Sequence, residues 1–143
     1  MDGRCSSSAS VVSGVPRGTV LGPLLFLCFI NDIVSEVNPS TQIRLFADDC
    51  LLYRSINSIQ DQIQLQHDLD SLSKWSHQWG MHFNPSKCNI LQISNVREPL
   101  LKFYQLEHKV LKHVDAAKYL SNLIEKTLSF SDHILDITTR AKP

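Results

Sequence analysis

Two adjacent aspartates interrupt an apolar, strand-like stretch, and this feature constrains the fold more than any other part of the chain. The stretch reads Arg44-Leu-Phe-Ala-Asp-Asp-Cys-Leu-Leu-Tyr53. Apolar residues flank the acidic pair on both sides, and too few residues separate them for anything but a tight connection. This pattern predicts a β-hairpin with Asp48 and Asp49 at its tip or just inside one strand.

Two carboxylates placed inside so apolar a run cost desolvation energy unless positive charge compensates them. The usual partner of clustered oxygen ligands is a hard divalent cation such as Mg²⁺. The alternative is an exposed turn, in which Asp is common because it turns well. The local sequence leaves both interpretations open.

A glycine- and proline-rich stretch precedes the hairpin: Ser13-Gly-Val-Pro-Arg-Gly-Thr-Val-Leu-Gly-Pro23. This composition predicts an irregular path along which backbone amides can approach phosphate or sugar, or a plain connection without a ligand. Pro23 suits the first turn of a helix. Residues 24–37 are apolar around almost the whole helix axis, which predicts a helix buried on most sides.

A second, longer helix is predicted after the hairpin. Ser58-x-x-Asp61 resembles a capping box, a leucine and tryptophan stripe continues to Trp79, and Gly80 is a typical stop. The chain then turns at Asn84-Pro85, passes Lys87 and enters a strand.

Short strands and one more helix complete the chain. A hairpin turn is predicted at Glu107-His108-Lys109, a further strand pair over residues 118–124, and a final helix capped by Ser129 or Ser131 with Ile134, Ile137 and Ala141 facing inward. Strands joined by short turns, with long helices between them, predict an α+β fold with an antiparallel sheet packed on the helices.

Composition narrows the class of protein. The 143 residues are 43% hydrophobic, enough for the core of one domain, and the net charge is zero. A neutral chain is expected to bind nucleic acid weakly or not at all by itself. The four cysteines lack zinc-site spacing and no signal peptide is evident, so reduced thiols and an intracellular location, nuclear or cytoplasmic, are expected. The apolar run over residues 20–30 is too short to span a membrane.

Several stretches together resemble the reverse transcriptases of non-LTR (LINE-like) retrotransposons. Residues 13–27, followed by Ile30-Asn-Asp-Ile33, resemble motif B of that family, and Leu45-Phe-Ala-Asp-Asp-Cys-Leu-Leu-Tyr53 resembles motif C. Phe83-Asn-Pro-Ser-Lys-Cys88 resembles motif D, and Lys118-Tyr-Leu with residues 128–134 resembles the motif E region. The chain then divides into an arm (1–12), motifs B to D (13–94), and the motif E region with the start of the following connection (95–143).

The resemblance implies part of a polymerase palm with a catalytic-type hairpin, and RNA-templated DNA synthesis supported by Mg²⁺. Asp48 and Asp49 would hold the metal, with Asp49 the less essential. Lys87 would donate a proton to the leaving pyrophosphate. Template RNA, primer DNA and deoxynucleotides are the implied partners. The residues implied to contact them are Gly14, Pro16, Arg17 and Gly18 on the nucleotide and template side, and Phe46, Ala47, Tyr119 and Leu120 on the primer side.

The chain departs from the family pattern at identifiable positions. Arg17 stands where the family usually has Gln, which exchanges a donor and acceptor for donors alone. Ser121 stands where the motif E turn usually has Gly, which predicts backbone strain. The family also needs a motif A aspartate upstream of motif B, and this chain begins at about the arm before motif B. The isolated chain is therefore expected not to polymerise DNA.

Two other interpretations compete with a polymerase fragment. The first is a non-enzymatic module that binds nucleic acid or protein. The second is a translated remnant of a mobile element without selected function, whose exposed palm surface would make it poorly soluble.

Overall fold

The computed structural model of the chain describes residues 18–94 and 102–141. The predicted arm and most of the glycine-rich stretch lie outside these residues. The chain forms two compact units, residues 1–82 and 83–143, and each is described by itself.

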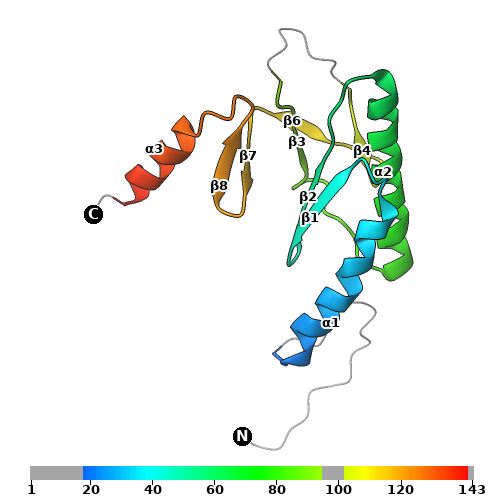
Figure 1. Ribbon diagram of the computed structural model, residues 1–143. Helices are drawn as coiled ribbons and strands as arrows, with labels where there is room; N and C mark the ends of the chain where they lie inside the picture. Colours follow the sequence, from blue (N-terminus) through cyan, green and yellow to red (C-terminus); the bar gives the residue numbers. More distant parts are fainter. Residues whose placement is uncertain (1–17, 95–101, 142–143) are drawn as a thin grey trace, which may run out of the picture. The chain divides into compact units, whose positions relative to one another are not determined.

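The first unit contains two α-helices, a 3-10 helix and one hairpin (Figure 1). In chain order these are α1 (Leu21–Ile30), η1 (Asn31–Glu36), β1 (Gln42–Phe46), β2 (Asp49–Tyr53) and α2 (Ile59–Trp79). Pro23 lies in the first turn of α1, as predicted. The predicted continuous helix instead changes to a 3-10 helix at Asn31-Asp32, where two side chains that compete for backbone hydrogen bonds replace the apolar run.

Helix α2 begins and ends where the sequence predicts. The Ser58 side chain accepts a hydrogen bond from the Asp61 amide, and the Asp61 carboxylate accepts one from the Ser58 amide, so the capping box is complete. Gly80 ends the helix in the left-handed conformation, with φ 63°. Both helix ends are satisfied, which makes this 21-residue helix the rigid element of the unit.

Hydrogen bonds at the start of α2 make the stability of the first unit sensitive to acid. Bonds from Ser58, then from Arg54 and the Asn57 amide, lower the pKa of Asp61 from 3.8 to about 2. Because the pKa is lower in the folded chain, this stabilisation is complete above about pH 4 and is lost as the pH falls through about 2. We expect Asp61→Asn to flatten the pH dependence of chemical unfolding in this window. Ser58→Ala should raise the pKa of Asp61, measured by carboxyl NMR; an unchanged pKa would contradict the assignment.

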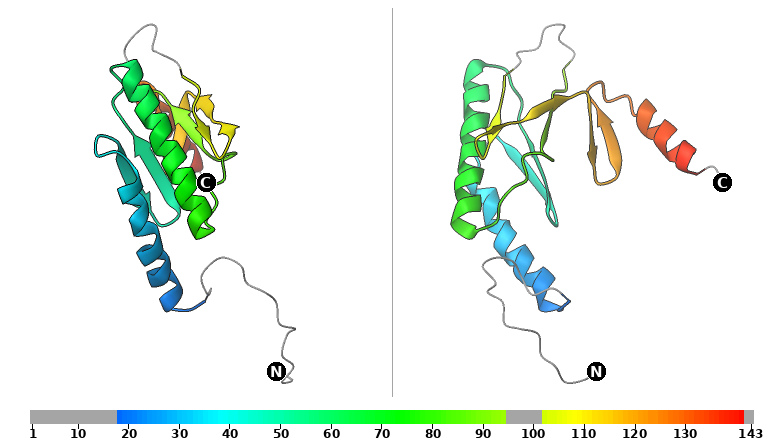
Figure 2. Two further views of the ribbon diagram at one scale, coloured as in Figure 1. Left: turned by 90° about the vertical axis from the view of Figure 1, so that its right-hand side faces the viewer. Right: turned by 180° about the vertical axis from the view of Figure 1, so that it is seen from behind.

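The core of the first unit lies between α2, η1 and the hairpin. The views in Figures 1 and 2 show α2 beside the hairpin, whose loop projects away from the helix. The buried apolar side chains are Ile30, Ile33, Ile43, Leu69, Leu72 and Trp75. The predicted stripe of α2 is thus confirmed for three of its members, whereas Trp79, 42% exposed, sits at its margin with its ring 4.9 Å from that of Phe29.

Helix α1 contradicts the prediction of a helix buried on most sides. Gly22 and Ile30 are its only buried residues. Its exposed apolar side chains are Leu21, Leu24, Leu25, Leu27 and Phe29. The reason is that only η1 and the end of α2 are available to cover it among the described residues of this unit. No helix among the described residues is long and apolar enough to cross a bilayer.

The second unit is built from short strand pairs and one helix. The antiparallel pairs are β4 (Gln105–Leu106) with β5 (Lys109–Val110), and β7 (Ala116–Tyr119) with β8 (Asn122–Glu125). The remaining pair, β3 (Asn89–Leu91) with β6 (Lys112–Val114), is parallel, so the prediction of antiparallel pairing throughout is wrong there. Tyr104, Leu106 and Leu111 form the buried apolar core. Mixed helices and small sheets confirm the α+β class.

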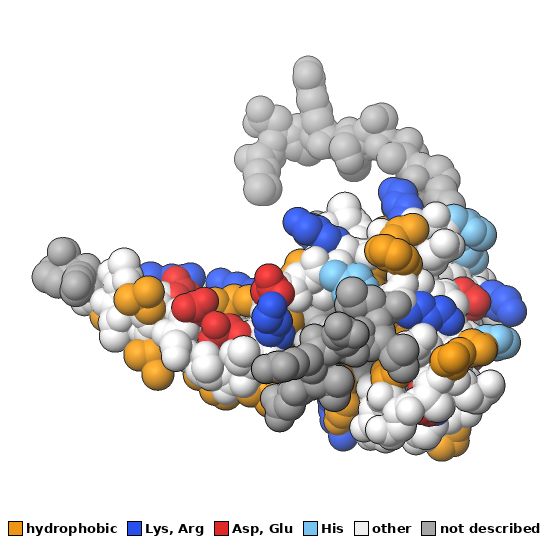
Figure 3. Space-filling view, turned by 90° about the horizontal axis from the view of Figure 1, so that it is seen from above, with side chains coloured by type: hydrophobic (Ala, Val, Ile, Leu, Met, Phe, Trp, Pro, Cys, Tyr) orange, Lys and Arg blue, Asp and Glu red, His pale blue; other side chains and the backbone are white. Residues whose placement is uncertain are grey.

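The last helix, α3 (Ser131–Arg140), differs from its prediction in two ways. Phe130 precedes it in the left-handed conformation without a side-chain cap, so neither predicted serine caps it. Ile134 and Ile137 are 57% and 50% exposed, because among the described residues of this unit α3 lies mainly against β8. On the face of the molecule shown in Figure 3, exposed hydrophobic side chains lie among charged ones.

The β7–β8 turn confirms the predicted strain at Ser121. Leu120 and Ser121 form its two-residue loop, and both have positive φ angles, 47° and 68°. Because such angles cost a side-chain-bearing residue about 1 kcal/mol, we expect Ser121→Gly to raise the free energy of unfolding of this unit by about that amount. Ser121→Ala is the matched control and should leave stability nearly unchanged. Equal stability of the two variants would contradict the strain.

Candidate functional site

The hairpin that carries the acidic pair has the tight geometry predicted from the sequence. Strands β1 and β2 pair antiparallel from Gln42 opposite Tyr53 to Phe46 opposite Asp49. Two residues, Ala47 and Asp48, remain for the loop. The prediction that the aspartates lie at the tip or just inside one strand is therefore confirmed for both.

The pleat of the hairpin separates a core-facing side from an open side. Ile43, 6% exposed, lies on the same face as Leu45 and Leu52, and this face is turned to the core. Asp49 lies on the opposite face. There it is opposite Phe46, which is 63% exposed, and it shares the face with Arg44 and Tyr53, whose guanidinium and ring are 6.0 Å apart.

Both carboxylates are exposed, which removes the desolvation argument made from the sequence. The apolar flanking residues alternate between the two faces instead of surrounding the acids. Among the described residues, no ion pair or hydrogen bond joins either carboxylate to another side chain. Two adjacent carboxylates, open to solvent at a hairpin loop, are able to take an oxygen-binding divalent cation.

Ala47 adopts an unusual backbone conformation beside the acidic pair. Its φ is 51°, in the left-handed region that favours glycine. A two-residue hairpin loop requires a positive φ at its first position in the turn types that match strand twist. Ala47 thus carries local backbone strain directly before Asp48, at a residue that is not glycine.

The predicted nucleotide-side residues are only partly described. Gly14, Pro16 and Arg17 lie outside the described residues. Gly18 has a φ of 78°, and a Cβ built there would meet no atom within 4 Å. The backbone angle, not close packing, is therefore what requires glycine at this position.

Lys87 belongs to the second unit and lies on a well-formed turn. Its amide donates to the Asn84 carbonyl at 2.9 Å, and the Asn84 side chain accepts from the Ser86 amide at 3.2 Å. The Lys87 side chain is exposed. Next to it, burial and then the charge of Glu107 raise the pKa of the Cys88 thiol. The proton-donor role of Lys87 stays a prediction.

The predicted primer-side residues Tyr119 and Leu120 also belong to the second unit. Tyr119 is the last residue of β7 and is half-buried, and Leu120 is in the strained turn at 38% exposure. The turn therefore presents an apolar side chain to solvent. Their contact with a primer likewise stays a prediction.

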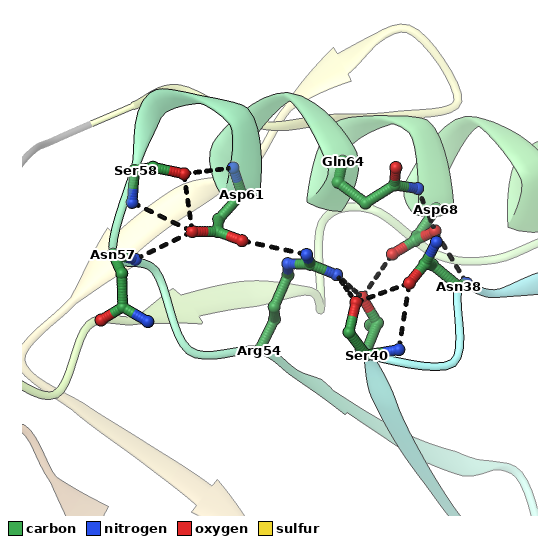
Figure 4. A network of polar contacts seen from close by, with 9 residues as sticks. Asn38, Ser40, Arg54, Asn57, Ser58, Asp61, Gln64 and Asp68 are labelled. Carbon is green, nitrogen blue, oxygen red and sulfur yellow. Dashed lines mark hydrogen bonds and ion pairs between the residues drawn. The ribbon is translucent and has the colours of Figure 1, made fainter.

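The sequence interpretation missed a buried polar network at the base of the hairpin. Thr41, Arg54 and Asp68 form it together with Asp61; Figure 4 shows Arg54 between Asp61 and Asp68. A signal was present: Asp68 lies three residues after Leu65 and four before Leu72, beside Leu69 on the apolar face of the helix, and a charge there requires partners when it is buried. Arg54 and Thr41 gave no such signal.

Comparison of the sequence with known proteins identifies the family of the chain. The family described as "Reverse transcriptase (RNA-dependent DNA polymerase)" matches residues 1–124. The chain is 33% identical over 141 residues to the "Probable RNA-directed DNA polymerase from transposon X-element" of Drosophila melanogaster, covering 96% of this chain and 15% of that protein. It is 33% identical over 144 residues to the "RNA-directed DNA polymerase from mobile element jockey" of the same organism, covering 96% and 16%.

The chain thus spans about a sixth of the length of these relatives. No solved structure matches it. The family match includes the hairpin with Asp48 and Asp49, the glycine-rich stretch and Lys87. The chain belongs to the reverse transcriptase (RNA-dependent DNA polymerase) family of non-LTR retrotransposons.

Proposed function

We propose that the chain supplies the acidic hairpin of a polymerase palm, and with it part of a two-metal nucleotidyl-transfer site that copies RNA into DNA. The observation that carries this proposal is the pair of exposed, unpaired carboxylates held by a two-residue loop at Ala47-Asp48. In such sites two Mg²⁺ ions about 3.5–4 Å apart stabilise the attacking and leaving oxygens of an in-line displacement.

The residues fit a hard cation such as Mg²⁺. Asp48 and Asp49 offer oxygen ligands without competing partners among the described side chains, and Mg²⁺ typically binds through one or two carboxylates together with substrate phosphates and water. Asp48, in the loop, would be the principal ligand. Asp49, on the open face of β2, would be the second.

The substrates follow from the same proposal. A deoxynucleotide would lie near residues 14–18 of the glycine-rich stretch, and a primer end would lie near Phe46 and Ala47. Phe46 supports this role because it is exposed beside Asp49 and offers an apolar surface on which a nucleotide can pack. Lys87 would protonate the leaving pyrophosphate, and Tyr119 and Leu120 would support the primer. Arg17 changes the hydrogen bonds available to the nucleotide.

Primer extension by the purified 143-residue protein tests whether the chain alone contains a complete two-metal site. We expect no Mg²⁺-dependent extension of a DNA primer on an RNA template, because two carboxylates supply only part of the ligand set that two ions need. The control is a reaction with a complete reverse transcriptase on the same template. Extension by the 143-residue protein that disappears with EDTA would contradict the proposal that the chain is an incomplete site.

A further inference from the structure

The base of the acidic hairpin is tied to α2 by a polar chain of four residues, two of which, Thr41 and Asp68, are buried. Thr41 lies directly before β1 and Arg54 directly after β2, so they mark the two open ends of the hairpin. Arg54 Nη1 donates to Thr41 Oγ1 at 3.1 Å, and Arg54 Nη2 donates to Asp61 Oδ1 at 3.0 Å. Thr41 in turn donates to Asp68 Oδ2. We refer to these four residues as the hairpin-base network.

The Thr41 hydroxyl is the central link of this network. It accepts from the guanidinium of Arg54 and donates to the carboxylate of Asp68, so one oxygen joins the cation to the anion. Asp68 is satisfied on its other side by the Asn38 amide at 3.0 Å and by Gln64 Nε2 at 3.1 Å. Valine has the shape of threonine without the hydroxyl. A Thr41→Val replacement therefore removes the Arg54–Thr41–Asp68 link with little change in volume, and it leaves the hydrogen bond from Arg54 Nη1 to Ser40 Oγ, 2.5 Å long, in place.

Burial makes the geometry of the network strict. Asp68 is 3% exposed, Thr41 4%, and the Arg54 side chain 10%, whereas the Asp61 side chain, at the start of α2, is 22% exposed. Charges withdrawn from water to this extent need good hydrogen-bond geometry in compensation, and they tolerate few alternative arrangements. Arg54 Nε is buried without a partner among the described residues, so the guanidinium is fixed by its two Nη groups alone.

Helix α2 gives the network a rigid support. Asp61 and Asp68 are seven residues apart on the same helix, which corresponds to about two turns and places them on one face. Asp61 is bound by Arg54, directly after β2, and Asp68 is bound by Thr41, directly before β1. Both ends of the hairpin are therefore hydrogen-bonded to a single helix that is capped at both ends.

We infer that Thr41, Arg54 and Asp68 are positioning residues that aim the Asp48-Asp49 pair. A hairpin of two strands is marginally stable alone, and no contact of the two carboxylates among the described residues fixes its tip. Five residues of strand span about 17 Å, so a tilt of about 5° at the base moves the tip by about 1.5 Å. A misplacement of about 1 Å at a reacting centre can cost a factor of about 100 in rate. The inference rests on the proposed function, because positioning has a purpose only if the pair holds a metal.

Two measurements on the 143-residue protein test this inference. Hydrogen exchange of the backbone amides from Ala47 to Cys50 reports on the mobility of the tip, and Mn²⁺-induced broadening of the Asp48 and Asp49 NMR signals reports on metal affinity. We expect Thr41→Val to speed tip exchange about tenfold and to weaken Mn²⁺ binding several-fold. Thr41→Ser restores the hydroxyl and should remain within about twofold of the unsubstituted protein in both measurements.

Controls separate positioning from general destabilisation. Ile33→Val weakens the same core away from the network, and it should lower global stability without changing Mn²⁺ affinity. Arg54→Lys keeps the charge but not the planar guanidinium, so its effects on tip exchange and Mn²⁺ affinity should lie between those of Thr41→Ser and Thr41→Val. If Thr41→Val does not fold, Arg54→Lys provides the test in its place.

Two results would overturn the inference: Thr41→Val or Arg54→Lys leaving both readouts unchanged, or Ile33→Val weakening Mn²⁺ binding as much as they do. Failure of the proposed function is recognised separately. If the unsubstituted protein shows no Mn²⁺ broadening at Asp48 and Asp49, the metal role fails, while the exchange rates still decide whether the network holds the tip.

Discussion

Asp48→Asn is expected to weaken Mn²⁺ binding at the hairpin loop by at least about tenfold, equivalent to about 1.4 kcal/mol. The change keeps the shape of the side chain and removes the negative charge that attracts a hard cation. Asp49→Asn should have a smaller effect, because Asp49 is the second ligand in the proposed site. The measurement is an NMR titration that follows broadening at the loop amides.

The matched control for this prediction is Asp32→Asn. Asp32 is also an exposed aspartate of the first unit, but it lies on η1 and not on the hairpin. Its replacement changes the net charge by the same amount and should leave loop broadening unchanged. If Asp32→Asn and Asp48→Asn weaken binding equally, Mn²⁺ responds only to overall charge and the hairpin is not a metal site.

The largest expected effect on stability is that of Trp75→Ala. Trp75 is 3% exposed in the core of the first unit, and truncating a buried aromatic side chain costs about 3–5 kcal/mol through lost burial and a residual cavity. That loss is comparable to the whole stability of a small domain, so the first unit should be largely unfolded. Denaturant unfolding followed by circular dichroism measures the change.

Trp79→Ala is the matched control, since the same side chain lies one turn later on the same helix. It is 42% exposed and contacts Phe29 ring to ring, so its truncation should cost only about 1 kcal/mol. Comparable losses for the two variants would contradict the arrangement of the core between α2, η1 and the hairpin.

Local signals explain which parts of the fold could be predicted. The bounds of α2 follow from Ser58, Asp61 and Gly80, whose roles depend only on residues within a turn of them. The acidic hairpin and the Glu107-His108 turn follow in the same way from short connections between apolar strands. The bounds of these elements depend on residues close to them in the chain, and local sequence is therefore enough to predict them.

The parts that were not predicted depend on contacts between distant residues. The parallel pairing of β3 with β6 joins segments more than twenty residues apart, and nothing local specifies its direction. Apolar composition indicated that α1 should be buried, but burial also requires a partner surface, and composition does not supply one.

In the candidate site, too, local features were predictable and features that depend on distant residues were not. Asp48 and Asp49 were located correctly from the flanking strands, whereas their exposure was not, because alternation of the flanking residues places the apolar groups on two faces. Arg54 and Thr41 were missed because a single polar residue at a strand end has no distinctive pattern. Their importance comes only from Asp68, which approaches them through the fold.

The central claim is that Asp48 and Asp49 act in nucleotide transfer when the rest of a polymerase is present. The most direct test replaces the matching segment of the jockey element polymerase with residues 1–124 of this chain and measures primer extension on an RNA template with Mg²⁺. We predict extension by this chimera, or by the chimera with Arg17→Gln, and its loss in Asp48→Asn. Undiminished extension by the Asp48→Asn chimera, or a folded chimera inactive with either Arg17 or glutamine, would contradict the claim.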